Sequence, residues 1–174
     1  TNTKGTAYGN QISFYTTSSG FSIGQNYDGG IIFYIDGTGQ HGLIAAPNDQ
    51  GTTQWGCSGT VISGANGTTI GSGQTNTTAI VTNCSTAGIA ARICDDLVLG
   101  GKSDWFLPSE AELVMMYQNL PVQGLGGFTT GNYWSSSQSN DVTAVYVWFS
   151  QNGGYGGTIG KYVTNVNIRA IRKF

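Results

Sequence analysis

Few residues in this sequence could carry out catalysis. His41 is the only histidine among the 174 residues, so a Ser-His-Asp triad would have to include it. Gly20-Phe-Ser-Ile-Gly24 matches the G-x-S-x-G pattern of a hydrolase nucleophile. That pattern is informative where a strand turns sharply into a helix, and the residues up to Gly30 predict no helix. We therefore interpret His41 as a structural or exposed strand residue and expect no enzymatic activity.

The acidic residues predict no catalytic pair. Asp95-Asp96 lie near the end of an expected helix, and Glu112 is expected to cap another helix. Neither pattern places two carboxylates across a cleft, as sugar hydrolysis requires. Spacings of Cys and His that bind zinc are absent, so we expect no cofactor. The open alternative is a Ca²⁺ ion bound by backbone carbonyls and by Asp28, Asp36 or Asp141.

The three cysteines leave two interpretations open. Cys57, Cys84 and Cys94 form an odd set, so they cannot all pair within one chain. A disulfide between Cys57 and Cys84 is one interpretation. Three buried free thiols are the other.

The clearest candidate for binding is the C-terminal part of the chain, where aromatic residues alternate with neutral polar ones. Tyr and Trp offer a large contact area at low entropic cost, and Asn, Ser and Gly provide adaptable hydrogen bonds, as in antibody paratopes. Aromatic rings among amides also suit stacking on sugar rings. Polar hairpin loops without a ligand are the alternative. The predicted ligand-binding residues are Asn132, Gln138, Asn140, Asp141, Tyr146, Trp148, Gln151, Asn152, Tyr155, Thr158, Tyr162 and Asn165.

These residues need a scaffold, and the sequence predicts an α+β domain. Residues 30–35 and 41–46 are β-prone runs around an Asp-Gly turn, which predicts a hairpin. The spacing of apolar residues predicts two main helices, over residues 85–97 and from Pro108 to Leu120, and residues 74–81 could form a short one. Short β-prone runs between Tyr133 and Ile171 predict antiparallel strands.

Other residues are predicted to hold this scaffold together. We expect Trp105 to anchor the junction between the helices and the last strands, and Trp134 to belong to the scaffold. Asp104 is predicted to form an ion pair with Arg169 or Arg172. Residues 1–24 are predicted to be an N-terminal linker or a strand that leads into a domain over residues 25–174.

The amino-acid composition indicates two classes of partner that we do not expect, nucleic acids and membranes. Charged residues make up 9% of the chain and the net charge is −2, with no basic stripe, so we expect no nucleic-acid binding. No apolar run approaches the length of a membrane span, so we expect no membrane insertion.

Several motifs, in the same order along the chain, resemble the DUF1566 family, which includes the C-terminal domain of the Legionella collagen-like adhesin. The resemblance covers about residues 24–174. The matching segments are Tyr27-Asp-Gly-Gly-Ile-Ile-Phe-Tyr-Ile-Asp36, Gly39-Gln-His-Gly-Leu-Ile44, Gly71-Ser-Gly-Gln-Thr-Asn76, Gly101-Lys-Ser-Asp-Trp-Phe-Leu-Pro-Ser109, Glu112-Leu113, Tyr133-Trp-Ser-Ser-Ser137 and Ile168-Arg-Ala-Ile-Arg172.

The resemblance implies a C-type-lectin-like fold with two helices and twisted antiparallel sheets. It also implies an adhesin on a bacterial surface or a phage receptor-binding protein, located extracellularly or on a virion. Some family members are variable proteins of diversity-generating retroelements, and the stretch from Tyr133 to Phe174 resembles their variable region. The expected partner is a cell-surface protein or glycan. The Glu-Pro-Asn motif of calcium-dependent lectins is absent.

Two other functions remain as alternatives. The domain could be a structural or oligomerisation tip of a fibre, in which case we expect a homo-oligomer. It could also be an enzyme with the related fold of formylglycine-generating enzymes, although no suitably placed cysteine pair is present.

Overall fold

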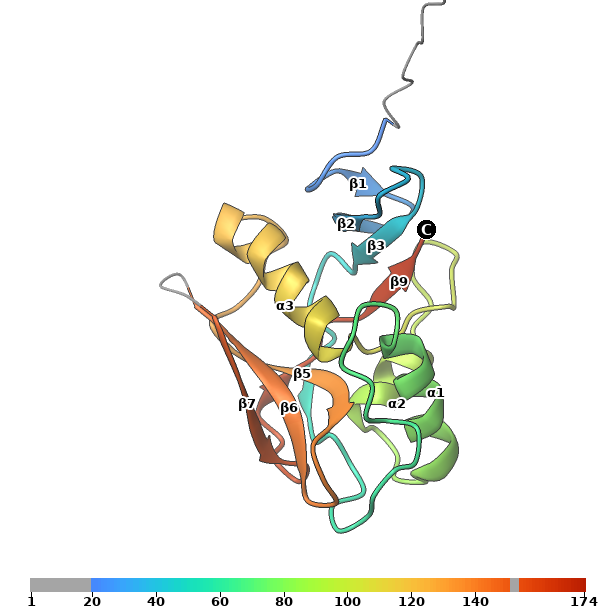
Figure 1. Cartoon of the computed structure of the whole chain (residues 1–174), viewed down its shortest axis with the longest axis vertical. Coiled ribbons are helices and arrows are strands. Elements are labelled where there is room, and N and C mark those ends of the chain that lie inside the picture. The colour runs from blue at the N-terminus through green and yellow to red at the C-terminus, as the bar shows by residue number, and fades with distance from the viewer. Residues whose placement is uncertain (1–19, 151–153) are drawn as a thin grey trace, which may run out of the picture.

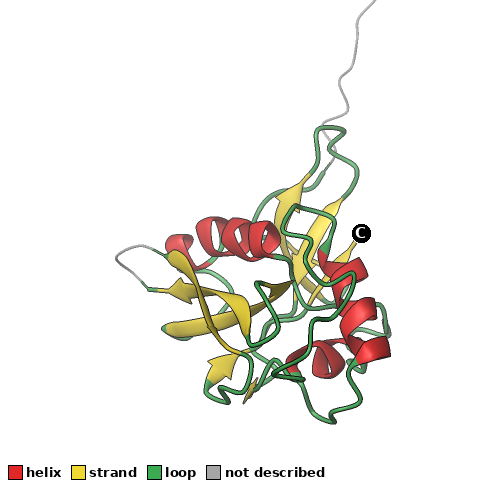
Figure 2. Ribbon diagram, turned by 60° about the horizontal axis from the view of Figure 1, so that its bottom comes forward, coloured by secondary structure: helices red, strands yellow, loops and turns green. Residues whose placement is uncertain are grey.

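The computed structural model describes residues 20–150 and 154–174, which form an α+β fold with two antiparallel-rich sheets (Figures 1 and 2). Its strands are β1 (Asn26–Tyr27), β2 (Gly30–Ile35), β3 (Gly42–Ala45), β4 (Thr52–Thr53), β5 (Gly131–Gln138), β6 (Thr143–Phe149), β7 (Tyr155–Gly160), β8 (Val166–Asn167) and β9 (Ile171–Lys173). Its helices are α1 (Gly73–Asn83), α2 (Ala90–Asp95), α3 (Glu110–Asn119) and the short 3₁₀ helix η1 (Pro121–Gln123).

The first sheet joins the two ends of the described chain. Its strand order is β1-β2-β3-β9, so the last strand pairs beside the N-terminal hairpin. The hairpin turns at Asp36, whose carboxylate accepts hydrogen bonds from the Thr38 and Gly39 N–H groups at 3.0 and 3.1 Å. Pairing of Ile35 with Gly42 sets the register of β2 and β3. The predicted hairpin is therefore present, with its turn at the Asp-Gly pair.

The second sheet carries most of the predicted ligand-binding residues. Its strand order is β4-β8-β5-β6-β7, and only the β5–β8 pair is parallel. β5 and β6 pair from Gly131 with Phe149 to Gln138 with Ala144, and their register shifts between Trp134 and Gln138. β7 pairs with β6 alone and forms one edge of the sheet.

The helices differ from the two that the sequence pattern predicted. The segment at 74–81 belongs to a full helix, α1, so the described residues contain three α-helices. The helix expected over residues 85–97 is limited to Ala90–Asp95. Gly88 has a φ of +64°, which is incompatible with a right-handed helix, so α2 begins only after Ile89.

Helix α3 begins and ends where the sequence predicted. The Ser109 hydroxyl accepts from the Glu112 N–H, and the Glu112 carboxylate accepts from the Ser109 N–H at 2.7 Å, which together form a capping box. Pro121 follows the helix and opens η1. The helix contacts β2, β5 and β6, so it bridges the two sheets (Figure 1).

Two groups of buried side chains form the core. The larger one packs α1 and α2 against both sheets and contains Trp55, Trp105 and Trp134. The second lies around α3 and contains Phe106, Tyr133 and Phe149, among others. Val147 and Phe149 of β6 belong to the group around α3 and Ala144 belongs to the larger group, so both faces of this strand contact a core.

The two ends of the described chain meet at one pole of the molecule. The ring of Phe21 lies 5.0 Å from that of Phe174 and 4.8 Å from that of Tyr27, in edge-to-face contacts. Residues 20–24 thus pack against the domain, while residues 1–19 of the predicted linker lie outside the described residues. No helix in the described ranges is long and apolar enough to cross a membrane.

Candidate ligand-binding surface

The pairing of β5, β6 and β7 brings four of the predicted residues onto one face of the second sheet. Asn132 lies opposite Trp148, and Trp148 lies opposite Tyr155. Tyr146 is two residues before Trp148, so it projects from the same face of β6. We call these four residues, Asn132, Tyr146, Trp148 and Tyr155, the aromatic strip.

Trp148 and Tyr155 form the exposed end of the strip. Their rings are stacked, with centroids 6.3 Å apart and an angle of 21° between the planes. Tyr155 is 60% exposed. Among the described residues, neither ring belongs to or packs against either core cluster. Trp148 itself is partly buried, so the pair offers another molecule the exposed Tyr155 ring and part of the Trp148 ring as an apolar surface.

Tyr146 is the fixed end of the strip. Its ring packs against the larger core cluster and lies across Gly157 of β7. A Cβ atom at Gly157 would lie only 3.0 Å from the Tyr146 hydroxyl oxygen, so a larger residue there would push the ring aside by a few tenths of an ångström. Trp134, which pairs with Tyr146 on β5, is buried and donates its indole N–H to the Thr53 carbonyl at 2.8 Å.

Other predicted residues lie at the far end of the sheet. We call Val61, Asn140, Asp141, Val142 and Tyr162 the loop tip. The Gly59 N–H donates to the Asp141 carbonyl at 2.9 Å, and the Lys161 N–H donates to the Val142 carbonyl at 2.9 Å, so three loops meet there. Tyr162 is 69% exposed.

The loop tip and the aromatic strip are separate surfaces. Val142 directly precedes β6 and lies six residues before Trp148, or about 20 Å along an extended strand. Figure 1 shows the β5–β6 turn at the pole opposite to the described chain ends. The Asn140 side chain accepts from the Val142 and Thr143 N–H groups at 2.9 and 2.8 Å, so it stabilises the turn. The sequence prediction treated these surfaces as one site, and the structure does not bring them together.

Gln138, expected to face a ligand, is buried instead. Its amide oxygen accepts from the Ile62 N–H at 2.9 Å and from the Lys161 ammonium at 3.1 Å, and its NH₂ group donates to the Ile62 carbonyl at 2.6 Å. Lys161 is itself buried 4.5 Å above the Trp55 ring, and this burial lowers its pKa. Gln138 therefore stabilises the loop that covers it.

The remaining predicted residues do not join the strip. Thr158 is exposed but pairs with Val145, so it points to the opposite face of the sheet. Asn165 is exposed in the loop before β8. Gln151 and Asn152 lie outside the described residues.

A network of hydrogen bonds and an ion pair stabilises the face of the second sheet opposite to the aromatic strip. The sequence predicted only part of this network. The buried Arg169 pairs with Asp49 at 2.7 Å and donates to the Ala46 and Gly126 carbonyls. Asp49 also accepts from the Tyr133 hydroxyl at 2.8 Å. Burial raises the pKa of Tyr133 to about 12. The sequence has no local signal for Asp49, because its partners lie more than 80 positions away.

The second predicted arginine lies at the junction of the first sheet. Arg172 forms a two-point contact with Asp104, at 2.7 and 3.0 Å, and also contacts Asp28 at 2.6 Å. Hydrogen bonds from Arg172 lower the pKa of Asp104 and of Asp28. Of the two pairings left open for Asp104, the structure contains the one with Arg172. Trp105 is buried in the larger core cluster.

The cysteines form one disulfide. Cys57 and Cys84 are bonded, with their Cα atoms 5.9 Å apart, so the loop before α1 is linked to the end of that helix. Cys94 is a buried free thiol in α2, and burial raises its pKa.

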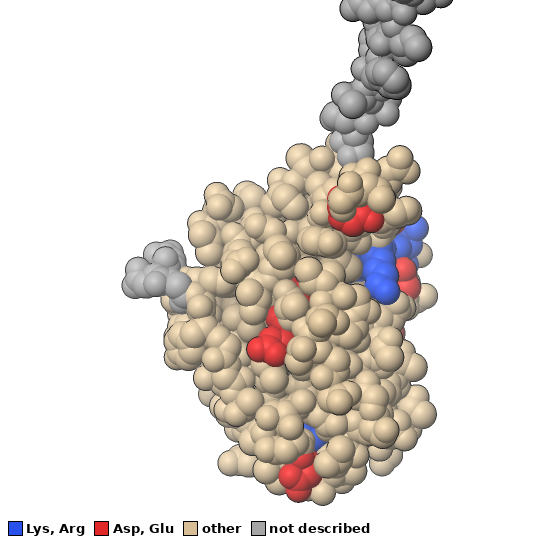
Figure 3. All heavy atoms as spheres, viewed as in Figure 1, with Lys and Arg blue, Asp and Glu red and all other residues tan. Residues whose placement is uncertain are grey.

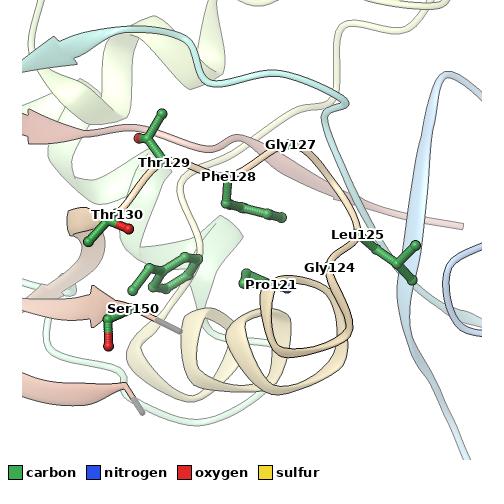
Figure 4. Close-up of a pocket in the computed structure, with 9 residues that line it drawn as sticks. Pro121, Gly124, Leu125, Gly127, Phe128, Thr129, Thr130 and Ser150 are labelled. Atoms are coloured by element: carbon green, nitrogen blue, oxygen red, sulfur yellow. The ribbon is translucent and has the colours of Figure 1, made fainter. Parts of the chain in front are cut away.

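A shallow hollow of about 180 Å³ lies beside the end of β6. Its lining includes Pro121, Phe128, Phe149 and Ser150 (Figure 4). In Figure 4 Leu125 points away from the hollow. The guanidinium of Arg169 lies 3.8 Å from the Phe128 ring. The ring is therefore held in place by a buried cation, and the hollow has an apolar, rigid wall.

Charged groups are sparse around the candidate surfaces. The aromatic strip contains no ionisable group other than its tyrosine hydroxyls. Figure 3 shows few charged side chains on the face of the molecule seen in Figure 1. Within residues 20–150 and 154–174, no three His, Cys, Asp or Glu side chains gather in an arrangement that could hold a metal ion. The strip can therefore form stacking contacts and neutral hydrogen bonds.

Comparison with known proteins supports the fold. No protein-family model matches this sequence, and no curated protein matches it. A fimbrial protein from Bacteroides ovatus ATCC 8483 has a similar fold, with a TM-score of 0.51 and 18% sequence identity. The likeness covers 75% of this chain and 35% of the fimbrial protein, so the chain spans about a third of the length of that protein.

Proposed function

We propose that this chain is a ligand-binding domain of the adhesin type, and that the aromatic strip is its contact surface. The single observation that carries this proposal is the stacked pair of Trp148 and Tyr155, which lies outside both core clusters of the described residues and in which Tyr155 is 60% exposed and Trp148 is partly buried. Folding gains little from leaving large rings in water. Exposed aromatic patches of this kind are typical of binding sites.

The chemistry of the strip favours an uncharged ligand. A sugar ring or a peptide side chain can stack on Trp148 and Tyr155 without the loss of an ion pair. Asn132 is the cross-strand neighbour of Trp148, and its side-chain amide forms no hydrogen bond with the described residues. It can therefore donate to and accept from a bound molecule. The strip is built on paired strands, so we expect little backbone change on binding.

The wider assignment also remains a proposal. We infer a C-type-lectin-like domain related to the DUF1566 family, displayed on a bacterial surface or a phage particle, with a cell-surface protein or glycan as its partner. The fold shared with a fimbrial protein supports a location outside the cell. The position of both described chain ends at one pole suits a domain that is tethered there. Whether a diversity-generating retroelement alters the C-terminal codons is part of the same hypothesis.

The proposal is tested by binding of the purified domain to a glycan array and to whole bacterial cells, with and without EDTA. The variant is Trp148→Ala combined with Tyr155→Ala. We expect at least about a tenfold loss of binding in this variant, because two stacked rings are removed. We also expect wild-type binding to be unaffected by EDTA.

The matched control is Tyr162→Ala, which removes an equally exposed tyrosine from the loop tip. Binding that persists in Tyr162→Ala and is lost in the double variant assigns the site to the strip. The opposite result would move the site to the loop tip. Binding that EDTA abolishes would replace the metal-free mechanism with a calcium-dependent one.

A further inference from the structure

Strand β7 is the long open edge of the second sheet. It has six residues, Tyr155–Gly160, and pairs only with β6. The opposite edge, β4, and the outer strand β1 of the first sheet have two residues each. β7 contains three glycines and no proline or charged residue. It therefore lacks the features by which proteins usually protect a sheet edge from pairing.

The hydrogen-bonding groups of β7 show which residues are open. The Lys161 N–H donates to the Val142 carbonyl at 2.9 Å, which continues the register of β6 and β7. Hydrogen-bonded positions alternate in an antiparallel ladder, so the N–H and C=O groups of Gly156 and Thr158 point away from β6. These groups have no hydrogen-bond partner in the described part of the chain. Gly160 offers only its N–H, because its carbonyl accepts from Val163.

We propose that β7 pairs with β7 of a second copy of this chain, antiparallel and about a two-fold axis at Gly157. In this register Gly156 of each copy lies opposite Thr158 of the other. Their outward N–H and C=O groups then form four main-chain hydrogen bonds. The result is one continuous sheet through both copies.

A second copy fits this edge because the edge is complementary to itself. The two open positions, Gly156 and Thr158, are symmetric about Gly157. The hydrogen bonds that Gly156 forms with Thr158 of the second copy are therefore repeated, through the two-fold axis, by Thr158 and Gly156 of that copy. Glycines at 156 and 157 allow the two backbones to approach, and no charge on β7 repels an identical strand. Tyr155 and Ile159 are also placed symmetrically, so the exposed Tyr155 ring packs beside Ile159 of the second copy.

The pairing has a consequence for the surface of the sheet. Tyr155 belongs to both the aromatic strip and β7, so the strips of the two copies lie on the same face of the joined sheet. The dimer would therefore present two strips side by side. The interface itself is small, so we expect reversible association that depends on protein concentration.

Sedimentation velocity over a wide range of protein concentrations tests the proposal. We expect a reversible dimer for the wild type and for Thr158→Ala, which keeps the main-chain N–H. Thr158→Pro removes that N–H from the open side of β7 and leaves the pairing with β6 intact. We expect it to raise the dimer dissociation constant at least about tenfold, because each copy loses a hydrogen bond.

Thr158→Glu is the second variant, because proline could disturb the strand itself. It places one negative charge on each copy close to the two-fold axis and near Glu110 of the other copy, whose carboxylate lies beside Gly156, so it should also favour the monomer. Circular dichroism checks that each variant is folded. A wild type that stays monomeric at all concentrations overturns the proposal, and so does a folded Thr158→Glu that dimerises like the wild type. Ligand binding by the monomeric variants is measured separately and bears only on the proposed function.

Discussion

The two faces of the β5–β6–β7 sheet use similar residues for different purposes. On the side of α3, Tyr133, Val147 and Phe149 are buried, and the rings of Tyr133 and Phe149 stack 4.2 Å apart. On the other face, the partly buried Trp148 stacks on the exposed Tyr155, outside both core clusters of the described residues. Trp148 lies between Val147 and Phe149 in the sequence, so the alternation of a strand alone separates the two groups.

The difference lies in what surrounds each ring. The inner Tyr133 is bound through Asp49 to Arg169, and Arg169 in turn lies over Phe128. The outer pair has no such support. The Trp148–Tyr155 end of the other face lacks such contacts, whereas Trp134 and Ala144 on that same face belong to the larger core cluster.

The largest effect is expected where the inner face loses its buried cation. Arg169→Ala leaves the partly buried carboxylate of Asp49 and the carbonyls of Ala46 and Gly126 without their partner. We expect a loss of about 3–5 kcal/mol in the free energy of unfolding, measured by urea titration. A loss below about 1 kcal/mol would show that the inner face does not depend on this network and would remove the contrast between the faces.

A smaller effect is expected from Tyr133 at alkaline pH. Its pKa is raised to about 12 in the folded state, above the ordinary value of about 10. The stability that it contributes is therefore fully present below about pH 10 and is lost as the pH rises through the folded pKa, by about 2–3 kcal/mol. Urea titrations from about pH 9 to about pH 12 should show this loss in the wild type and not in Tyr133→Phe.

The outer face supplies the control for that experiment. Tyr155→Phe removes a hydroxyl from an exposed ring and should leave the alkaline loss of stability unchanged. If Tyr133→Phe loses stability with pH as steeply as the wild type, the inner hydroxyl is not the group that titrates.

Local signals in the sequence predicted the elements that depend on neighbouring residues. Ser109, Glu112 and Pro121 predict both ends of α3, and the structure contains that helix with its capping box. The Asp36-Gly turn likewise predicts the β2–β3 hairpin. The predicted start of α2 was wrong because Gly88 adopts a left-handed conformation. The spacing of apolar residues over residues 85–97 does not reveal that conformation.

The sequence predicted which types of residue form the candidate surface but not how these residues are arranged. Gln138 is buried because a loop 76 positions earlier folds over it, and Asp49 is recruited by Tyr133 and Arg169 from distant parts of the chain. Such contacts have no local pattern. The split between the aromatic strip and the loop tip also depends on the strand register, which composition cannot supply.

The smallest effect separates the two ends of the aromatic strip, Trp148 and Tyr155 at one end and Tyr146 at the other. Trp148 and Tyr155 pack against neither core cluster of the described residues, so Tyr155→Ala, at an exposed ring, should change the free energy of unfolding by less than about 0.5 kcal/mol and Trp148→Ala, at a partly buried ring, by no more than about 1 kcal/mol. Tyr146 packs against the larger cluster and across Gly157, so Tyr146→Ala should cost about 1–2 kcal/mol. Thermal and urea unfolding of the three variants measure these differences in the free energy of unfolding. Equal losses would mean that the outer face, like the inner one, is part of the core and is not free to bind.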